Sequence, residues 1–261
     1  MNTVTSSAKA GAWQAFFDEL ARWRDAGRTA EFWWRDDDAA RPDAALARLF
    51  ALAQRTSTPL ALAVIPMQCA KQIFEDAGSF ISVLQHGTDH ANRADADGKK
   101  TEFVAAEAPA AAMARLAAAR AVLEPQAGKR FLPVLAPPWN RLPDHLAAPL
   151  AAAGYRGLSR FGVRPGAEAA PGLRQVNTHV DLIAWHSGRG FVGEEPALAA
   201  ATKHLAAKRI AVADPEEATG WLTHHLVHDE AAWRFLERLF ETTRGLPAVA
   251  WRRPAELFHI S

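Results

Sequence analysis

Residues 31–38 read EFWWRDDD, a short apolar, strand-like run that ends in three aspartates. Three adjacent carboxylates repel one another, and at the end of a buried strand they cannot all be well solvated. A bound divalent cation would offset this repulsion, and so would Arg35 or a helix N-terminus. The alternative reading of Asp36, Asp37 and Asp38 is an N-cap cluster for a helix that opens near Pro42. The triplet is therefore a candidate metal or catalytic site, with helix capping as its structural alternative.

Strands and helices alternate on either side of this stretch. Before it, the aromatic and leucine side chains from Trp13 to Trp23 recur at helical spacing, and Gly27 ends that helix. After it, helical and strand-like runs follow in turn. The predicted strands are 59–65, 80–84, 131–135, 157–161, 219–222 and 248–251, and the predicted helices are 42–53, 108–123, 143–153 and 230–242. This alternation predicts an α/β fold with a largely parallel sheet covered on both faces.

Polar residues follow the predicted strands repeatedly. They are Asp36-Asp37-Asp38, His86 with His90, Trp139-Asn140-Arg141, and His224-His225. In parallel α/β folds, ligands gather at the carboxyl ends of the strands. We therefore expect these four segments to form one site.

Two histidine pairs have the i, i+4 spacing that can grip zinc. The first pair, His86 and His90, lies in a small, polar, turn-like segment after a strand. The second pair, His224 and His228, begins at a strand end and continues toward a helix. Ten histidines make such a spacing easy to obtain by chance, so a structural or exposed role is the alternative for either pair.

The segment Pro137-Pro138-Trp139-Asn140-Arg141 is rigid because two prolines fix its backbone. The prolines lack N–H groups, which leaves those of Trp139 and Asn140 in a preorganised frame. Such N–H groups stabilise an oxyanion. A rigid surface turn with an anchoring tryptophan is the structural alternative.

Composition indicates a globular chain without a strong electrostatic preference. The 261 residues are 49% hydrophobic, and 30 basic against 29 acidic residues give a net charge of +1. No basic stripe argues for nucleic acid or anionic lipid as a partner. Neutral small molecules and sugars remain open as ligands.

The single cysteine, Cys69, allows no internal disulfide. The start from Met1 to Gly11 lacks an apolar signal-peptide core, and the apolar run from Leu60 to Met67 is too short to span a bilayer. We expect a cytoplasmic protein without stable membrane insertion.

The order of motifs resembles that of the polysaccharide deacetylases, carbohydrate esterase family four. Five segments carry the resemblance, each similar to one family pattern. They are Asp36-Asp37-Asp38 (TFDDG), His86-Gly87-Thr88-Asp89-His90 (H[S/T]xxH), Ala136-Pro137-Pro138-Trp139-Asn140 (RxPxG), Asp181-Leu182-Ile183-Ala184-Trp185 (DxxDW) and Leu222-Thr223-His224 (LxH). Together they span roughly residues 30–230 in the family's order.

The resemblance implies a distorted (β/α) barrel with about seven parallel strands. The whole chain, 1–261, would form one catalytic domain, with residues 1–28 as an N-terminal helix packed on the barrel. The implied activity is metal-dependent removal of an N-acyl group, acetyl or formyl, from a sugar-containing substrate. The implied cofactor is a divalent metal, with zinc as the expected ion.

By the same resemblance, one aspartate is the general base and the next is a metal ligand beside His86 and His90. Trp139 would donate its N–H to the oxyanion, and His224 would protonate the leaving amine. The triple aspartate leaves two registers. The number of residues between the triplet and Leu46, the first buried residue of the next predicted helix, favours Asp36 as base and Asp37 as ligand. This is the assignment we prefer. Ala39 follows the triplet at the place where the family pattern has a glycine after its two aspartates. This favours Asp37 as base and Asp38 as ligand, so Asp38 stays a candidate ligand.

Two departures from the family patterns concern the residues around these groups. The arginine expected to hold the base is Ala136, so Arg141 or the extra aspartate would have to compensate. The second acid of the fourth motif is Ala184, so Asp181 is the candidate that tunes His224. Pro138, Asn140, Arg141 and Trp185 are expected to line the substrate site.

Two other readings compete with this one. The chain could be a non-catalytic member that binds sugar with its tryptophans, or another metal-dependent amidohydrolase with His224 and His228 as ligands. The missing leader favours an intracellular saccharide, such as a nucleotide- or lipid-linked glycan precursor, as substrate.

Overall fold

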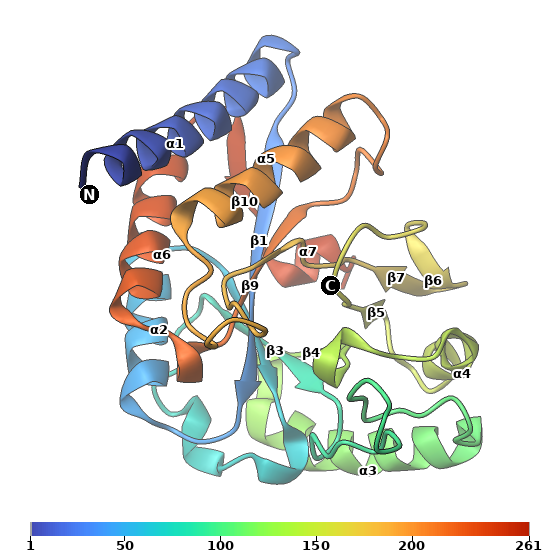
Figure 1. Ribbon diagram of the computed structural model, residues 1–261. Helices are drawn as coiled ribbons and strands as arrows, with labels where there is room; N and C mark the ends of the chain where they lie inside the picture. The colour runs from blue at the N-terminus through green and yellow to red at the C-terminus, as the bar shows by residue number, and fades with distance from the viewer. Residues whose placement is uncertain (1, 261) are drawn as a thin grey trace.

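A computed structural model describes the backbone of residues 2–260 and the side chains of residues 11–260 (Figure 1). The strands are β1 (Ala30–Ala39), β2 (Leu60–Val64), β3 (Ile81–His86), β4 (Phe131–Ala136), β5 (Gly157–Leu158), β6 (Glu168–Ala170), β7 (Leu173–Gln175), β8 (Val180–Asp181), β9 (Thr219–Thr223) and β10 (Val249–Trp251). The helices are α1 (Asn2–Asp25), α2 (Ala44–Thr56), α3 (Pro109–Ala127), α4 (Ala147–Ala152), α5 (Glu194–Arg209), α6 (Glu230–Thr243) and α7 (Pro254–Leu257). Short 3-10 turns follow several strands, among them η1 (Pro66–Gln68), η4 (Pro138–Asn140) and η6 (His225–Val227).

The predicted α/β architecture with a largely parallel sheet is confirmed. The strand order is β6-β7-β5-β4-β3-β2-β1-β9-β8, with β10 added beside the start of β1. Every pair is parallel except β6 with β7. The sheet has ten strands rather than about seven, because β6, β7 and β8 are two or three residues long and leave no apolar run in the sequence.

The two ends of the sheet are brought together into a distorted barrel. Residues 176–179 join β7, near one end of the order, to β8 at the other. Within this connection Thr178 forms a parallel bridge with Phe161, and Asn177 O accepts the indole N–H of Trp33 at 3.0 Å. Gly220 of β9 allows this close approach, because a Cβ there would lie 2.4 Å from the Trp33 Nε1 and 2.6 Å from Asn177 O.

Strand β1 is longer than the sequence indicated. It continues through all three aspartates to Ala39 instead of ending at Arg35. It pairs with β2 on one side and with β9 on the other, so parallel ladders hold the backbone from both sides as far as Asp36, and the pairing with β2 resumes at Ala39. The charges alone did not reveal that this segment is a strand.

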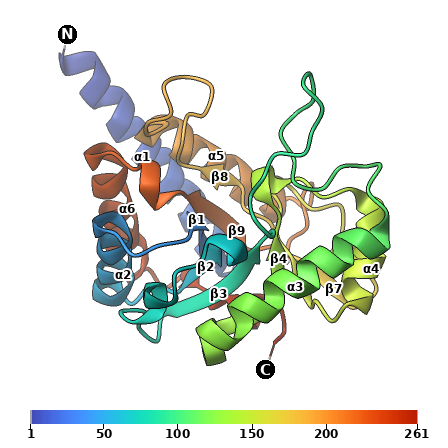
Figure 2. The same cartoon turned by 90° about the horizontal axis from the view of Figure 1, so that it is seen from below.

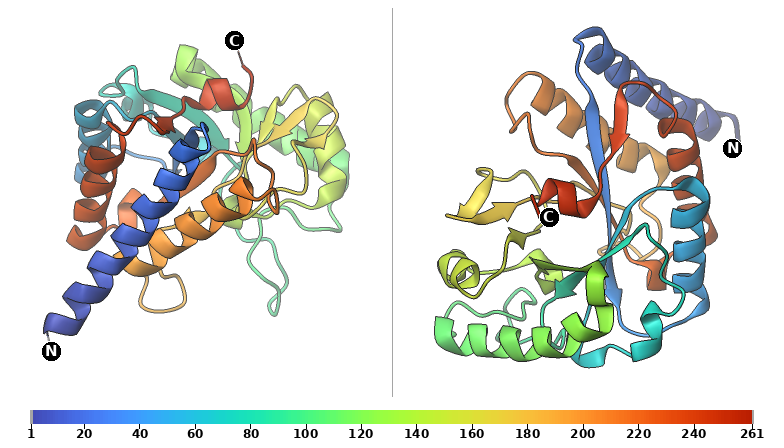
Figure 3. Two further views of the ribbon diagram at one scale, coloured as in Figure 1. Left: turned by 90° about the horizontal axis from the view of Figure 1, so that it is seen from above. Right: turned by 180° about the vertical axis from the view of Figure 1, so that it is seen from behind.

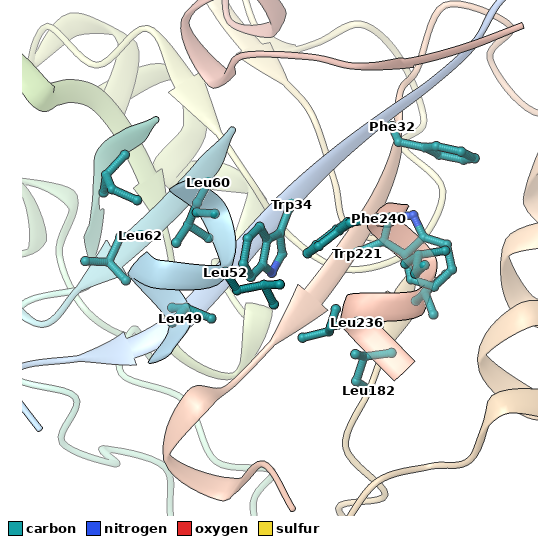
Figure 4. Close-up of a cluster of buried hydrophobic side chains, with 14 of the residues drawn as sticks. Phe32, Trp34, Leu49, Leu52, Leu60, Leu62, Leu182, Trp221, Leu236 and Phe240 are labelled. Carbon is teal, nitrogen blue, oxygen red and sulfur yellow. The ribbon is translucent and has the colours of Figure 1, made fainter. Parts of the chain in front are cut away.

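The largest hydrophobic cluster lies between the sheet and helices α1, α2, α5 and α6. Trp34 of β1 and Phe240 of α6 lie with ring centroids 4.7 Å apart in this cluster, among leucines from α2 and β2 (Figure 4). Each of the two helices begins at an aspartate that accepts a backbone N–H, Asp43 for α2 and Asp229 for α6. Asp43, beyond the triplet, is thus the helix cap.

Helix α1 lies beside α5 across the end of the barrel where β1 begins (Figures 1 and 3). Trp13 donates its indole N–H to Glu194 at 2.6 Å, and Trp23 donates its own to Leu205 O at 3.3 Å. Both tryptophans are buried, so in this structure they serve the packing of α1 on α5.

Among residues 2–260, no helix combines the length and the apolar character that crossing a bilayer requires.

Replacing Gly220 by alanine tests the packing at the barrel closure. The added Cβ would meet the Trp33 indole and two backbone atoms, so we expect the free energy of unfolding to fall by about 1–3 kcal/mol. Urea unfolding measures this change. Gly245→Ala is the control, because a Cβ at Gly245 meets nothing within 4 Å. Equal stability of the two variants would contradict the proposed close packing.

Candidate active site

The carboxyl ends of β4, β3, β1 and β9 meet at one end of the barrel (Figure 2). Each of these strands ends in, or is followed by, one of the polar segments singled out in the sequence. The expectation that the four segments lie together is therefore confirmed for their backbone positions. Their side chains divide into groups with different partners.

The three aspartates of β1 point in different directions. Side chains alternate along a strand, so Arg35 and Asp37 share one face and Asp36 lies on the other. Asp38 departs from this alternation because its φ is 71°, a left-handed value that few non-glycine residues adopt. The triplet therefore supplies three separate environments.

Asp38 faces both histidines of the first pair. Its Oδ1 lies 3.1 Å from the Nε2 atom of His86 and 3.1 Å from that of His90. Burial alone would raise the pKa of Asp38, but the adjacent His86 and His90 outweigh it and hold that pKa well below its usual range. One carboxylate oxygen and two ring nitrogens thus converge on one point.

This donor set fits a divalent metal. Two ligand atoms bonded to one zinc ion at about 2.1 Å lie roughly 3.0–3.4 Å apart at tetrahedral or octahedral angles, close to the separations seen here. The Nδ1 atom of His86 lies 2.9 Å from Ala136 O and donates to it, which leaves the lone pair of Nε2 for a metal. Asp38, His86 and His90 could therefore hold a cation.

Gly87 and Glu102 shape the turn that carries His90. Gly87 has φ 61°, and a Cβ there would lie 2.3 Å from the Glu102 carboxylate and 2.5 Å from the ring of Pro138. The fully buried Glu102 accepts the backbone N–H of Thr88 at 2.8 Å and that of His90 at 3.1 Å. Sequence reasoning missed Glu102, because it comes from a loop twelve residues beyond His90 without a motif of its own. It also placed Pro138 at the substrate, whereas the proline is buried against Gly87.

Arg35 holds Asp37. The guanidinium is fully buried and bonds both carboxylate oxygens, from Nε at 2.8 Å and from Nη2 at 2.9 Å. Its other donors reach the Asn140 side-chain oxygen at 2.6 Å, the Ser159 hydroxyl at 2.6 Å and Ser159 O at 3.0 Å. A bidentate arginine fixes a carboxylate in position and orientation.

The pair of Arg35 and Asp37 bears on the arginine that the family pattern would place at Ala136. Arg141 does not replace it, because its exposed side chain donates to Lys100 O. The arginine that bonds Asp37 is Arg35, two residues earlier on the same strand. Asn140, expected at the substrate, binds the guanidinium instead.

The turn after Pro138 has a strained backbone. Trp139 and Asn140 both have positive φ, 56° and 58°. The N–H of Asn140 donates to Pro137 O at 2.9 Å, so of the two N–H groups expected to be available, only that of Trp139 lacks such a bond within the described part of the chain. The Trp139 ring packs on His90, with centroids 4.4 Å apart.

Asp36 lies away from the metal ligands. It accepts the Thr223 hydroxyl at 2.6 Å and the His225 N–H at 3.0 Å, and its second oxygen faces the His225 Nδ1 at 2.5 Å. Burial would raise its pKa, but His225 outweighs burial and lowers it. The preferred register, with Asp36 as base and Asp37 as ligand, does not match this arrangement, in which Asp38 joins the histidines and Asp37 lies beside it.

His224 follows β9 and is 8% exposed. Its Nδ1 is buried without a hydrogen-bond partner, and the edge of its ring contacts Trp185 at a centroid distance of 4.7 Å. Asp181 accepts the indole N–H of Trp185 at 2.8 Å and the backbone N–H of Ile183 at 2.9 Å, and burial raises its pKa. Asp181 is thus linked to His224 through Trp185 rather than by a direct hydrogen bond.

His228 gives no support to the alternative ligand set. Neither of its ring nitrogens has a hydrogen-bond partner, and burial lowers its pKa to about 4. Within the described residues, it belongs to neither of the two side-chain groups whose atoms converge as metal ligands would.

The second such group is His179, His204 and Glu217, buried between α5 and β9. The Nδ1 of His179 accepts the backbone N–H of Gly220 at 3.0 Å, so the neutral ring carries its proton on Nε2, 3.3 Å from Glu217. An N–H group cannot bind a metal without losing its proton. We therefore assign this group a structural role.

Comparison with known proteins identifies the fold. No family model matches the sequence, and no curated protein matches it. Solved structures match over nearly the whole chain. A protein from Mycobacterium smegmatis assigned as a polysaccharide deacetylase has a TM-score of 0.58 at 15% identity, covering 89% of this chain and 90% of its own. The PuuE allantoinase has a TM-score of 0.60 at 12% identity, covering 88% and 89%.

A family 4 carbohydrate esterase from Streptomyces lividans, solved with acetate, has a TM-score of 0.52 at 11% identity, covering 85% of this chain and 90% of its own. The chain thus has the fold of the polysaccharide deacetylases and carbohydrate esterases of family four. The allantoinase has the same fold.

Metal analysis of purified variants tests the candidate ligands. His86→Ala, His90→Ala and Asp38→Asn should each lower bound metal at least about 10-fold, because each removes one of three converging ligands. His228→Ala and His204→Ala should leave the metal content unchanged. Elemental mass spectrometry after dialysis against zinc measures the stoichiometry. Retention of metal by His86→Ala together with its loss from His228→Ala would support the alternative ligand set.

Proposed function

We propose that this protein is a metal-dependent hydrolase that removes an acyl group, acetyl or formyl, from the nitrogen of a sugar-containing substrate. The observation that supports this best is the convergence of Asp38, His86 and His90 beside Asp37, whose carboxylate Arg35 fixes. The fold agrees with this activity, since carbohydrate esterases share it.

The proposed metal ligands are Asp38, His86 and His90, and zinc suits their one oxygen and two nitrogens. A bound divalent ion would polarise the acyl carbonyl and lower the pKa of a coordinated water.

Asp37 is the proposed general base. Arg35 occupies one side of the carboxylate with two parallel hydrogen bonds and so restricts the orientations available to it. Held in this way, Asp37 can take a proton from a water that attacks the carbonyl carbon.

Two groups on the other strands complete the proposed reaction. The free N–H of Trp139 donates to the oxygen that becomes negative as the carbonyl carbon turns tetrahedral. His224 then protonates the leaving nitrogen, and Trp185 holds the edge of its ring. Asp181, whose carboxylate binds the Trp185 indole, supports that contact.

The two alternative functions, sugar binding without catalysis and hydrolysis of a small amide, differ in the site that each requires. A sugar-binding protein without catalysis has no use for a tethered base beside three convergent ligands. An amidohydrolase acting on a small amide would use the same site, and the allantoinase with this fold keeps that option as the second candidate.

Acyl release should depend on Asp37. The zinc-loaded protein is expected to free acetate or formate from N-acylated saccharides, and Asp37→Asn should lower kcat about 10²–10⁴-fold with metal retained. Chitotriose, UDP-N-acetylglucosamine and allantoin form the substrate panel, with acid release or ureide hydrolysis as the readout. Activity on allantoin alone would contradict the saccharide substrate, and no activity on any substrate, in wild type, would favour the non-catalytic reading.

Arg35 and Arg141 form a matched pair for testing the tether of the base. Arg35→Lys keeps the charge but cannot bond both oxygens of Asp37, so kcat should fall about 10- to 100-fold. Arg141→Lys should stay within about twofold of the wild type, because the exposed Arg141 donates its hydrogen bond to the backbone of Lys100 and not to Asp37. Urea unfolding separates lost activity from lost folding. A larger loss for Arg141→Lys would restore the loop arginine as the partner of the base.

A further inference from the structure

Asp36 forms hydrogen bonds with Thr223 and His225, the two residues that flank His224 in the sequence. Strands β1 and β9 pair so that Asp36 lies opposite Thr223. The carboxylate accepts the hydroxyl of Thr223 and the backbone N–H of His225, and its other oxygen bonds the His225 ring. His224 therefore lies in the middle of a three-residue segment whose two ends are tied to one carboxylate.

The ring of His224 lacks the usual means of orientation. A histidine that transfers protons from one ring nitrogen is generally held through a hydrogen bond at the other. Here Nδ1 of His224 is buried without a partner, and Ala184 has no side-chain acceptor. Among the described residues, the ring meets Trp185 in a T-shaped contact, and the backbone that carries it sets its position.

The hydrogen bonds between Asp36 and residues 223 and 225 continue into the hydrophobic core. Trp34, which is fully buried, donates its indole N–H to the Thr223 hydroxyl at 2.8 Å, and that hydroxyl donates to Asp36. The hydrogen-bonded atoms have little freedom to move because the indole is packed on all sides. The backbone of residues 223–225 is thus fixed relative to β1, which also carries Asp37 and Asp38.

We propose that Asp36 is a positioning residue for His224, fixing the imidazole where it can protonate the leaving nitrogen. The inference rests on the proposed function in assigning that proton transfer to His224. It gives the first aspartate of the triplet a task separate from those of Asp37 and Asp38. Asp36 itself contacts neither the metal ligands nor the leaving group.

Substrates with different leaving groups test this role. In Asp36→Ala, kcat for an N-acetylated saccharide should fall about 10²-fold, because a small displacement of the proton donor costs that much. The rate with 4-nitrophenyl acetate should change less than about threefold, since nitrophenolate departs without a proton. Equal losses on both substrates at unchanged metal content would overturn the proposal, because a general structural defect affects both reactions.

Asp36→Asn provides the conservative rescue. Its amide oxygen still accepts from Thr223 and from the His225 N–H, and its amide N–H can donate to a neutral His225 Nδ1. We expect this variant to keep the N-acetyl activity within about fivefold of wild type. A loss as large as that of Asp36→Ala would mean that hydrogen bonding to residues 223 and 225 is not what Asp36 contributes.

A double-mutant cycle shows whether Asp36 acts through His224. In the His224→Ala background, adding Asp36→Ala should lower the N-acetyl rate by less than about threefold, whereas independent effects would multiply to the full 10²-fold. Full multiplication would overturn the proposal.

Crystal structures decide the question even if the wild type hydrolyses no amide, an outcome that would refute the proposed function alone. In Asp36→Ala, the His224 ring should shift while Asp38, His86 and His90 keep their positions, and in Asp36→Asn it should stay in place. An unmoved His224 ring in Asp36→Ala would refute the positioning role.

Discussion

Three carboxylates end a strand that is buried on both faces, and a buried charge persists only where it is paired. Each aspartate of β1 has its own compensation: His225 and Thr223 for Asp36, Arg35 for Asp37, and two imidazoles for Asp38. The ladders to β2 and β9 fix the backbone as far as Asp36, and the pairing of Ala39 with Val64 fixes it again just beyond Asp38. The arrangement of the whole site follows from this requirement.

Strand geometry separates the three environments. Alternation along β1 places Arg35 and Asp37 on one face and Asp36 on the other, and the left-handed backbone at Asp38 turns the third carboxylate toward β3. The partners come from other strand ends, Thr223 and His225 at the end of β9 for Asp36, and His86 and His90 at the end of β3, two strands away, for Asp38. Three adjacent aspartates on one strand thus have three different sets of partners.

Much of the fold and of the candidate site could be predicted from the sequence, and the features that could not be predicted have physical causes. The strand and helix alternation and the gathering of polar residues at strand ends follow from hydrophobic periodicity, which is local. The convergence of His86, His90 and an aspartate also agrees with the motif order. The register within the triplet could not be chosen, because it depends on the φ of Asp38 and on the partners that β3 and β9 bring. Glu102 was missed for the same reason, since contacts between distant segments leave no spacing in the chain. Arg35 was recognised as a charge that could offset the triplet, but its pairing with Asp37 was not, because the predicted strand ended at Arg35 and so did not place the two residues on one strand face.

The tether between Arg35 and Asp37 has an evolutionary consequence. Because the arginine is encoded two codons before the carboxylate it holds, the two are inherited as one short block and keep their geometry when the loop after β4 changes. A change of Asn140 in that loop would remove one hydrogen bond of the guanidinium but leave the two bonds between Arg35 and Asp37 in place. Searches for related chains that require an arginine in the β4 loop would pass over such sequences, whereas an Arg-x-Asp pair at a strand end, followed by a histidine pair, would recover them.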